Sequence, residues 1–382
     1  MRSRPNGGPV RVAAGILPVL VLLLRAGVAD AAVLYGMGDG SRHDGWGWHW
    51  AVSDDGSVVA GYSATVAEVP TSMSWTREQG RVALRDAAGN LIPNSAATAI
   101  SGDGAWVFGG GRDGTSMFRW NRATRAVDYF TILSGGEGRE FFDASRDGSA
   151  VVGNLTGQDV VSKAFRWTSD GGAVSLLGLA GFAWTQARGV SRDGSVVIGN
   201  AFGENSSAAV RWRGGGEPQR LATPAGYEFV TTQGASPSGD FIPGMAQNLD
   251  FETVALLWRG DDDPLVFGPP PGGTGVGAVA VSDTGVLAGM SDRPDAGGSH
   301  AALWDAQHGA RWLSDVLVEN GIDVRGWRFL TVSAISADGL TLVGDGTGPR
   351  GETSFIAVLP EPGAAALAVA FSSLGLLRRR RR

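Results

Sequence analysis

The apolar residues of this chain are gathered in short runs that are separated by turn-forming residues. One phrase recurs, namely a small residue, Ser, any residue, Asp, Gly, two or three apolar residues and then Gly. It occurs seven times, twice in degraded form, and begins at Ser53, Ser101, Ser145, Ser191, Ser236, Ser282 and Ser336. Successive Ser residues lie 48, 44, 46, 45, 46 and 54 positions apart, so the pattern predicts seven tandem structural units.

Each unit predicts four short β-strands, named a to d here in chain order. Strand a ends at the Ser, and Asp-Gly then forms the turn to strand b, with a hairpin geometry that needs positive φ at both central residues. Strand c carries a Trp in six units, and strand d closes the unit. Only Leu313 to Asn320 is expected to form a helical turn or two. The turn aspartates are Asp55, Asp103, Asp147, Asp193 and Asp338, and the Trp residues are Trp75, Trp120, Trp167, Trp212, Trp258 and Trp304.

The unit length and the two ends of the array predict a closed ring. Residues 32–359 comprise 328 positions, or about 47 per unit, which is typical of β-propeller blades. The seventh unit lacks its strand d, while Ala32 to Gly36 is a spare strand at the start of the body. A ring that pairs these two segments has no free sheet edge. We therefore predict an all-β, seven-bladed β-propeller of four-stranded blades over residues 32–359, closed by its N-terminal strand, with the Trp residues packed between blades.

The N-terminal segment, residues 1–31, has the pattern of a signal peptide. Basic residues precede an apolar run from Val12 to Leu24, and Ala29 and Ala31 are the small residues expected before the cleavage site. Thirteen residues span about 20 Å as a helix, which is short for a hydrocarbon core of about 30 Å. A signal peptide is therefore favoured over a transmembrane anchor.

The C-terminal segment, residues 360–382, combines three parts in a fixed order. Pro360, Glu361 and Pro362 come first, an uncharged stretch from Gly363 to Leu377 follows, and the chain ends with Arg378, Arg379, Arg380, Arg381 and Arg382. This tail resembles the PEP-CTERM sorting signal of exported bacterial proteins. The resemblance implies transient anchoring in the inner membrane, an exosortase-type enzyme as processing partner, and release to the cell surface or extracellular matrix. The alternative is an ordinary tail anchor with the Arg cluster on the cytoplasmic side.

The repeats themselves resemble the HAF-type repeats of exported bacterial proteins. The matching segments are Lys163 to Trp167 and His300 to Trp304, together with the Ser-x-Asp-Gly phrases. The resemblance implies an extracellular repeat protein without an assigned activity.

Composition and charge narrow the possible chemistry. The chain has no Cys and four His, which argues against thiolate or three-His metal sites. Its net charge is −6, and without the nine Arg and two acidic residues of the two ends the body has 23 basic and 36 acidic side chains, hence −13. Such an acidic body disfavours nucleic acid as a partner. We expect a monomer without cofactor or metal, and we expect the repeated aspartates to stabilise turns, since one Asp per turn cannot supply the six to eight oxygens that Ca²⁺ needs.

Aromatic residues before strands a are the best candidates for a binding face. Such platforms stack on sugar rings, although the same residues could instead fill the crevices between blades. They are Trp46, Trp184, Phe229, Trp327 and Phe329. The acidic run from Asp261 to Asp263 is expected to be a solvated loop rather than a cation site.

Three functions are compatible with this pattern. The first is a non-enzymatic exported module that binds or organises exopolysaccharide or a surface protein. The second is a polysaccharide hydrolase or lyase with a pair of carboxylates in the central funnel, although only Asp143 places a carboxylate on a strand a near its Ser. The third is a purely structural surface protein.

Overall fold

The computed structural model describes residues 32–37, 50–66, 69–92, 95–111, 117–130, 138–157, 160–351 and 354–361. The predicted signal peptide, Trp46, Pro362 and the terminal Arg cluster lie outside these ranges. Within them, no helix has both the length and the apolar character needed to cross a membrane.

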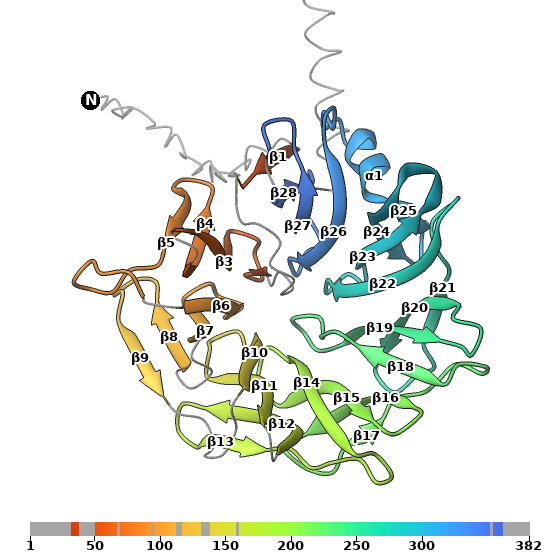
Figure 1. The fold of residues 1–382 in the computed structure, drawn as a ribbon, viewed down its shortest axis with the longest axis horizontal. Helices are drawn as coiled ribbons and strands as arrows, with labels where there is room; N and C mark the ends of the chain where they lie inside the picture. The colour runs from red at the N-terminus through yellow and green to blue at the C-terminus, as the bar shows by residue number, and fades with distance from the viewer. Residues whose placement is uncertain are drawn as a thin grey trace, which may run out of the picture.

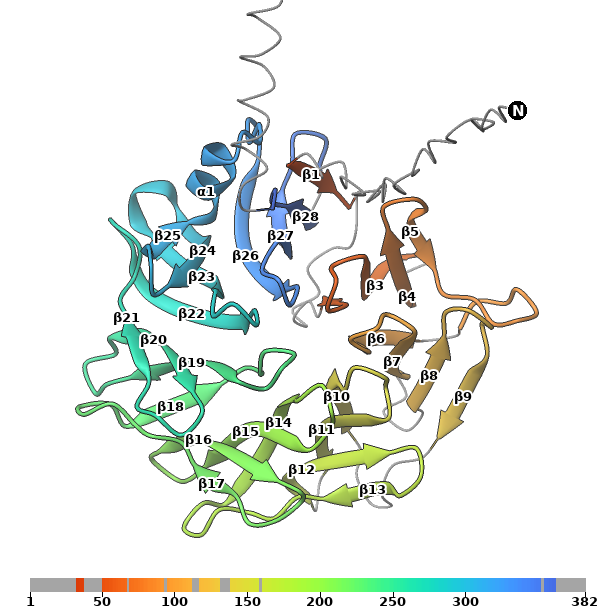
Figure 2. The ribbon, with the colours of Figure 1, turned by 180° about the vertical axis from the view of Figure 1, so that it is seen from behind.

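Antiparallel sheets stand around a central axis in the manner of propeller blades (Figure 1 and, from behind, Figure 2). Five of them are separate four-stranded sheets. The first contains β2 (Ala51–Val52), β3 (Val58–Val66), β4 (Val69–Thr76) and β5 (Gly80–Ala83); the second β6 (Ser95–Ile100), β7 (Trp106–Gly111), β8 (Met117–Asn121) and β9 (Val127–Phe130); the third β10 (Gly138–Ala144), β11 (Ala150–Gly157), β12 (Val160–Thr168) and β13 (Gly172–Ser175). The fourth contains β22 (Thr274–Val281), β23 (Leu287–Arg293), β24 (Gly298–Asp305) and β25 (Gly309–Trp312); the fifth β26 (Arg328–Ile335), β27 (Thr341–Thr347), β28 (Ser354–Val358) and β1 (Val33–Gly36).

The remaining strands form one eight-stranded sheet, so the prediction of seven separate blades is wrong. There are five separate four-stranded blades, and the fourth and fifth repeat units share the larger sheet. This sheet contains β14 (Trp184–Val190), β15 (Val196–Phe202), β16 (Ser207–Arg213), β17 (Gln219–Arg220), β18 (Phe229–Thr232), β19 (Phe241–Gln247), β20 (Thr253–Arg259) and β21 (Leu265–Phe267). Strand β17 pairs with Val210 and Arg211 of β16, and one parallel pair, between Ser207 of β16 and Phe229 of β18, joins the two units.

The predicted closure of the ring by the N-terminal strand is confirmed. Strand β1 pairs with β28 in antiparallel register from Val33–Val358 to Gly36–Phe355. It thereby supplies the outer strand that the last unit lacks, and the outer edge of β28 is covered. A backbone bond from Met37 N to Ser354 O, 2.9 Å long, extends this pairing beyond the strand.

The repeated Trp residues lie in the core, as expected. Their exposed fractions are 8% or less, and those of Trp212, Trp258 and Trp304 are 1% or less. Each of these three indoles donates a hydrogen bond of 2.8 to 2.9 Å to a carbonyl 35 or 36 residues earlier, in the segment that follows the previous unit's strand d. The Trp residues therefore fix each unit to its predecessor by packing and by hydrogen bonding.

Two short helices interrupt the strands in the last third of the chain. The 3-10 helix η1 (Pro294–Ala296) connects β23 to β24, and α1 (Leu313–Glu319) follows β25. Helix α1 buries Leu313, Val316 and Leu317 against the neighbouring sheet, which confirms the single short helix predicted in this spacer.

Candidate functional site

The Ser-x-Asp-Gly phrase folds into a turn that its own side chains hold together. At the most regular copy, Ser191 Oγ donates to Asp193 Oδ1 over 2.6 Å, and Ser195 N donates to the same oxygen over 3.0 Å. Ser191 Oγ also accepts from Val196 N over 3.0 Å. Because the Ser191 hydroxyl and the Ser195 amide stabilise the ionised form, the pKa of Asp193 falls to about 2.

The predicted turn geometry is wrong in one respect, because the Asp does not have positive φ. Gly194 has φ of 72°, whereas the non-glycine residues with positive φ in the described ranges are Arg125 and Phe251. Gly194 N donates to Ser191 O over 2.8 Å, so Ser191 and Gly194 are the first and last residues of a four-residue turn. Only the last position requires the left-handed conformation that glycine adopts without strain.

The same hydrogen bonds recur around the ring. The side chains of Asp55, Asp103, Asp147 and Asp338 accept from the preceding Ser hydroxyls over 2.6 to 3.0 Å. In the two degraded copies, hydroxyl pairs replace the carboxylate, with 3.1 Å between Ser236 and Ser238 and 2.7 Å between Ser282 and Thr284. Within the described residues, no group of three or more His or acidic side chains is arranged to hold a metal ion.

The seven turns meet in a ring at one end of the central channel. Backbone hydrogen bonds join each turn to the next, and in most turns the residue at the variable position x donates over 2.8 to 3.0 Å. These bonds are Asp54 N to Gly102 O, Arg146 N to Arg192 O, Arg192 N to Pro237 O, Asp283 N to Ala337 O and Ala337 N to Asp54 O. In the second turn, Asp103 N donates to Arg146 O over 2.8 Å, and the x residue Gly102 donates to Ser145 O over 3.4 Å. Pro237 has no N–H, and here the amide of Ser238 donates to Asp283 Oδ1 over 2.7 Å instead.

Four of the x residues are charged and form ion pairs across this ring. The Asp54 carboxylate lies 3.2 Å from Arg146 and 3.0 Å from Arg192. Arg192 also reaches Asp283 over 3.2 Å. The side chain of Asp54 is only 14% exposed, whereas that of Arg146 is 53% exposed. The repeated residues of the phrase do not reveal this cluster, because x is the one position that the phrase leaves free. The available signal was the charge of four of the residues at x.

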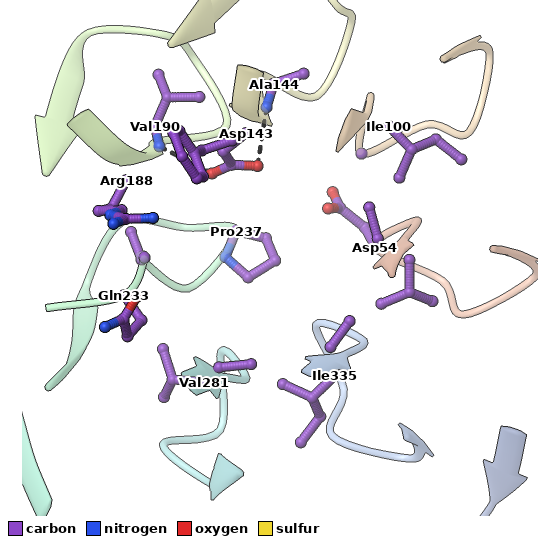
Figure 3. A pocket seen from close by; sticks show the side chains of 18 of the residues that line it. Asp54, Ile100, Asp143, Ala144, Arg188, Val190, Gln233, Pro237, Val281 and Ile335 are labelled. Atoms are coloured by element: carbon purple, nitrogen blue, oxygen red, sulfur yellow. Dashed lines mark hydrogen bonds between the residues drawn. The ribbon is translucent and has the colours of Figure 1, made fainter. Parts of the chain in front are cut away.

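The channel itself is narrow and has a mixed lining. Its cavity of about 150 Å³ is lined by strands a of the units and by the x residues. Figure 3 shows Asp54, Asp143, Arg188 and Gln233 among apolar side chains such as Ile335. A cavity of this size holds several water molecules.

Asp143 lies in this channel at an irregularity of β10. The register of β10 against β11 shifts between Phe141 and Asp143, which is the behaviour of a β-bulge that redirects a side chain. One carboxylate oxygen accepts from Ala144 N and the other from Val190 N of β14, each over 2.8 Å (Figure 3). Burial in the channel, with a smaller contribution from the negative charge of Asp54, raises the pKa of Asp143 to about 7.

The predicted aromatic face is divided among separate packing contacts. Trp184 stacks on Phe202 of the neighbouring strand at 3.9 Å between ring centroids. Trp327 stacks on Phe329 at 5.7 Å, and Phe329 is itself 3% exposed. Phe229 is half-buried at the start of β18. In the described part of the chain, no ring contact joins Trp184, Phe229 and Trp327 into one platform, and their role as a binding face stays a prediction.

The beginning of the predicted sorting signal is described, and it leaves from the last sheet. Leu359 N donates to Leu340 O over 2.8 Å, after which Pro360 and Glu361 have no regular structure. The acidic run from Asp261 to Asp263 is exposed, as expected for a surface loop. Asp261 forms ion pairs with Arg211 and, over 3.5 Å, with Arg213.

Comparison with solved structures places the architecture among known folds. The chain folds as a β-propeller. Oligogalacturonate lyase of Vibrio parahaemolyticus aligns with a TM-score of 0.57 at 11% identity over 87% of this chain and 98% of that chain. An oligogalacturonate lyase in complex with manganese aligns with a TM-score of 0.55 at 13% identity over 82% and 89%. These identities support the fold alone.

Other comparisons add no family. TolB from Acinetobacter baumannii aligns with a TM-score of 0.42 at 16% identity over 57% of this chain, and this chain spans 54% of that protein. No protein-family model matches the sequence. No curated protein matches it either.

Proposed function

We propose that the protein is an exported, surface-associated β-propeller that acts as a non-enzymatic binding or scaffold module in the extracellular matrix or exopolysaccharide of a bacterium. In this proposal the tail anchors the chain transiently in the inner membrane and is sorted by an exosortase-type system. The repeat architecture and the sequence patterns of the two termini support the assignment.

One observation carries the non-enzymatic part of the proposal. The two carboxylates of the central channel already have structural partners, because Asp143 accepts two backbone N–H groups and Asp54 pairs with two arginines. A general acid or base must instead reach the proton it transfers in a bound substrate.

The test is a glycan array and a pull-down with the full chain, combined with a search for oligosaccharide products. Retention of a glycan or a surface protein without cleavage supports the proposal, and the absence of any partner contradicts it. Loss of surface texture in cells that lack the protein, without any binding activity, would favour the purely structural alternative. Mass spectrometry of the exported protein would show whether both termini are processed as proposed.

The second candidate is a polysaccharide hydrolase or lyase that uses the channel. The pKa of about 7 for Asp143 favours it, since such a carboxyl exchanges protons near neutral pH. Glycan cleavage by the wild type that is lost in Asp143→Asn but kept in Asp193→Asn would establish this alternative over the first.

A further inference from the structure

A second cavity lies between the first two repeat units, and its lining shares no residue with that of the channel. It has a volume of about 1010 Å³. Its walls carry Arg85 from the segment after β5 and Arg122 and Arg125 from the turn between β8 and β9. All three arginines are exposed. We call this cavity the arginine groove.

The two walls of the groove are held in place by hydrogen bonds. Trp120 Nε1 donates to Arg85 O over 2.8 Å and thereby links the two repeat units. On the other wall, Arg122 Nε donates to Gly104 O over 3.0 Å. Asn121 Oδ1 accepts from the amides of Ala123 and Thr124 over 3.1 and 3.0 Å and fixes the turn. The arginines therefore start from a rigid backbone, which reduces the entropy lost when a ligand binds.

The charges of these arginines are not neutralised by carboxylates. In the described part of the chain, Arg85 donates to Gly89 O and Arg122 to Gly104 O, and no ion pair involves either of them or Arg125. Glu78 is the acidic residue in the lining, so three positive charges and one negative give the groove a net charge of +2. This is the reverse of the acidic body, which carries −13, and an anion is therefore attracted to this part of the surface.

The groove also has apolar surface beside its charges. Leu84 and Trp120 lie at its base, and Val82 is 37% exposed. Guanidinium groups bind carboxylates through paired, charge-assisted hydrogen bonds, while apolar side chains suit the C–H faces of sugar rings. A sugar polymer that carries carboxylates matches both features.

We propose that the arginine groove binds an anionic polysaccharide built from uronic acids. This inference rests on the proposed function and deepens it by naming the class of glycan and the surface that holds it. None of the predicted aromatic residues lines the groove, so the two candidate surfaces are separable by mutation.

The experiment measures binding of the full chain, purified in a nonionic detergent, to alginate and to the propylene glycol ester of alginate. The ester keeps the polymer and removes most of its negative charge. The test variant is Arg85→Gln/Arg125→Gln, which retains Arg122 and its bond to Gly104. The matched control is Arg220→Gln/Arg325→Gln, which removes the same charge from exposed positions outside the groove.

We expect wild-type protein to bind alginate, to bind the ester at least tenfold more weakly, and to lose affinity as NaCl increases. The test variant should bind alginate about tenfold more weakly, and the control should bind like the wild type. Equal losses in both variants, or equal binding of alginate and its ester, would overturn the arginine groove but leave the proposed function intact. Wild-type self-association that the test variant abolishes, without alginate binding, would also overturn it, because the groove would then hold an acidic segment of another copy. Retention of neutral glycans alone would support the proposed function and refute the groove.

Discussion

Replacement of Gly199 by Ala tests the contact between the first two strands of a unit. A Cβ at this position would lie 1.9 Å from Gln186 O and 3.0 Å from Ala187 Cα. Since the closest favourable C···O contacts are about 3.3 Å long, β15 would have to move away from β14 by more than 1 Å. The atoms in the way belong to the backbone of β14, so the clash cannot be relieved by rotation of a side chain. The register of β14 against β15 also shifts beside this point, between Ala187 and Gly189.

We expect Gly199→Ala to cost about 3 kcal/mol, the upper end of what overpacked sites lose. For a chain of this size the loss lowers the midpoint of thermal unfolding by about 4 °C. Circular dichroism of the full chain, followed on heating, measures the shift. The matched control is Gly178→Ala, because no atom lies within 4 Å of its would-be Cβ, and its midpoint should stay within 1 to 2 °C of wild type. Equal midpoints for the two variants would refute the close approach of the strands.

Three further predictions follow from the ring, the channel and the turns. Leu34→Cys/Ala357→Cys places two thiols at paired positions of β1 and β28 in a chain without other Cys; mild oxidation should form an intramolecular disulfide, seen by mass spectrometry, and failure to do so would contradict the closure. Because the pKa of Asp143 is raised above its unfolded value, its contribution to stability is greatest below about pH 4 and is lost as pH rises toward 7. The free energy of unfolding of the wild type, measured in urea, should therefore fall between about pH 4 and 7 relative to that of Asp143→Asn. The pKa of Asp193 is about 2, outside this window, so Asp193→Asn should show the same pH trend as the wild type. Asp193→Ala should cost about 1 kcal/mol through loss of the turn hydrogen bonds, and an unchanged urea midpoint would show that the carboxylate does not hold the turn.

The sequence pattern predicted the elements that depend on local chemistry. Ser191, Asp193 and Gly194 specify a turn by themselves. The Trp that follows in six units, such as Trp212, indicates a buried position in each of them. Ring closure was predictable because the missing strand of the last unit and the spare strand at Val33 are both visible as segments. The joining of two units was not predictable, because it rests on a single residue pair, between Ser207 and Phe229, that no repeated feature marks.

The ion pairs of the channel cluster could not be derived from the repeated residues, although its four charged side chains stand at the variable position x. Asp54 and Arg192 are 138 positions apart, and only the circular arrangement brings the two side chains together. The same is true of Asp143 and the Val190 amide. The groove between the first two units likewise depends on which arginines find carboxylate partners, and spacing along the chain does not determine this.

Because β1 is made before its partner β28, the ring cannot close until β28 has been synthesised. Tyr35 pairs with Ile356, which lies 321 positions later in the chain. At a synthesis rate of about 5 to 20 residues per second, the ribosome needs roughly 16 to 64 s for this stretch. During that time the earliest strand is without its neighbour and is open to mispairing. A prematurely terminated chain would keep this vulnerability permanently, so the closing strand also distinguishes finished molecules from fragments that aggregate or are degraded.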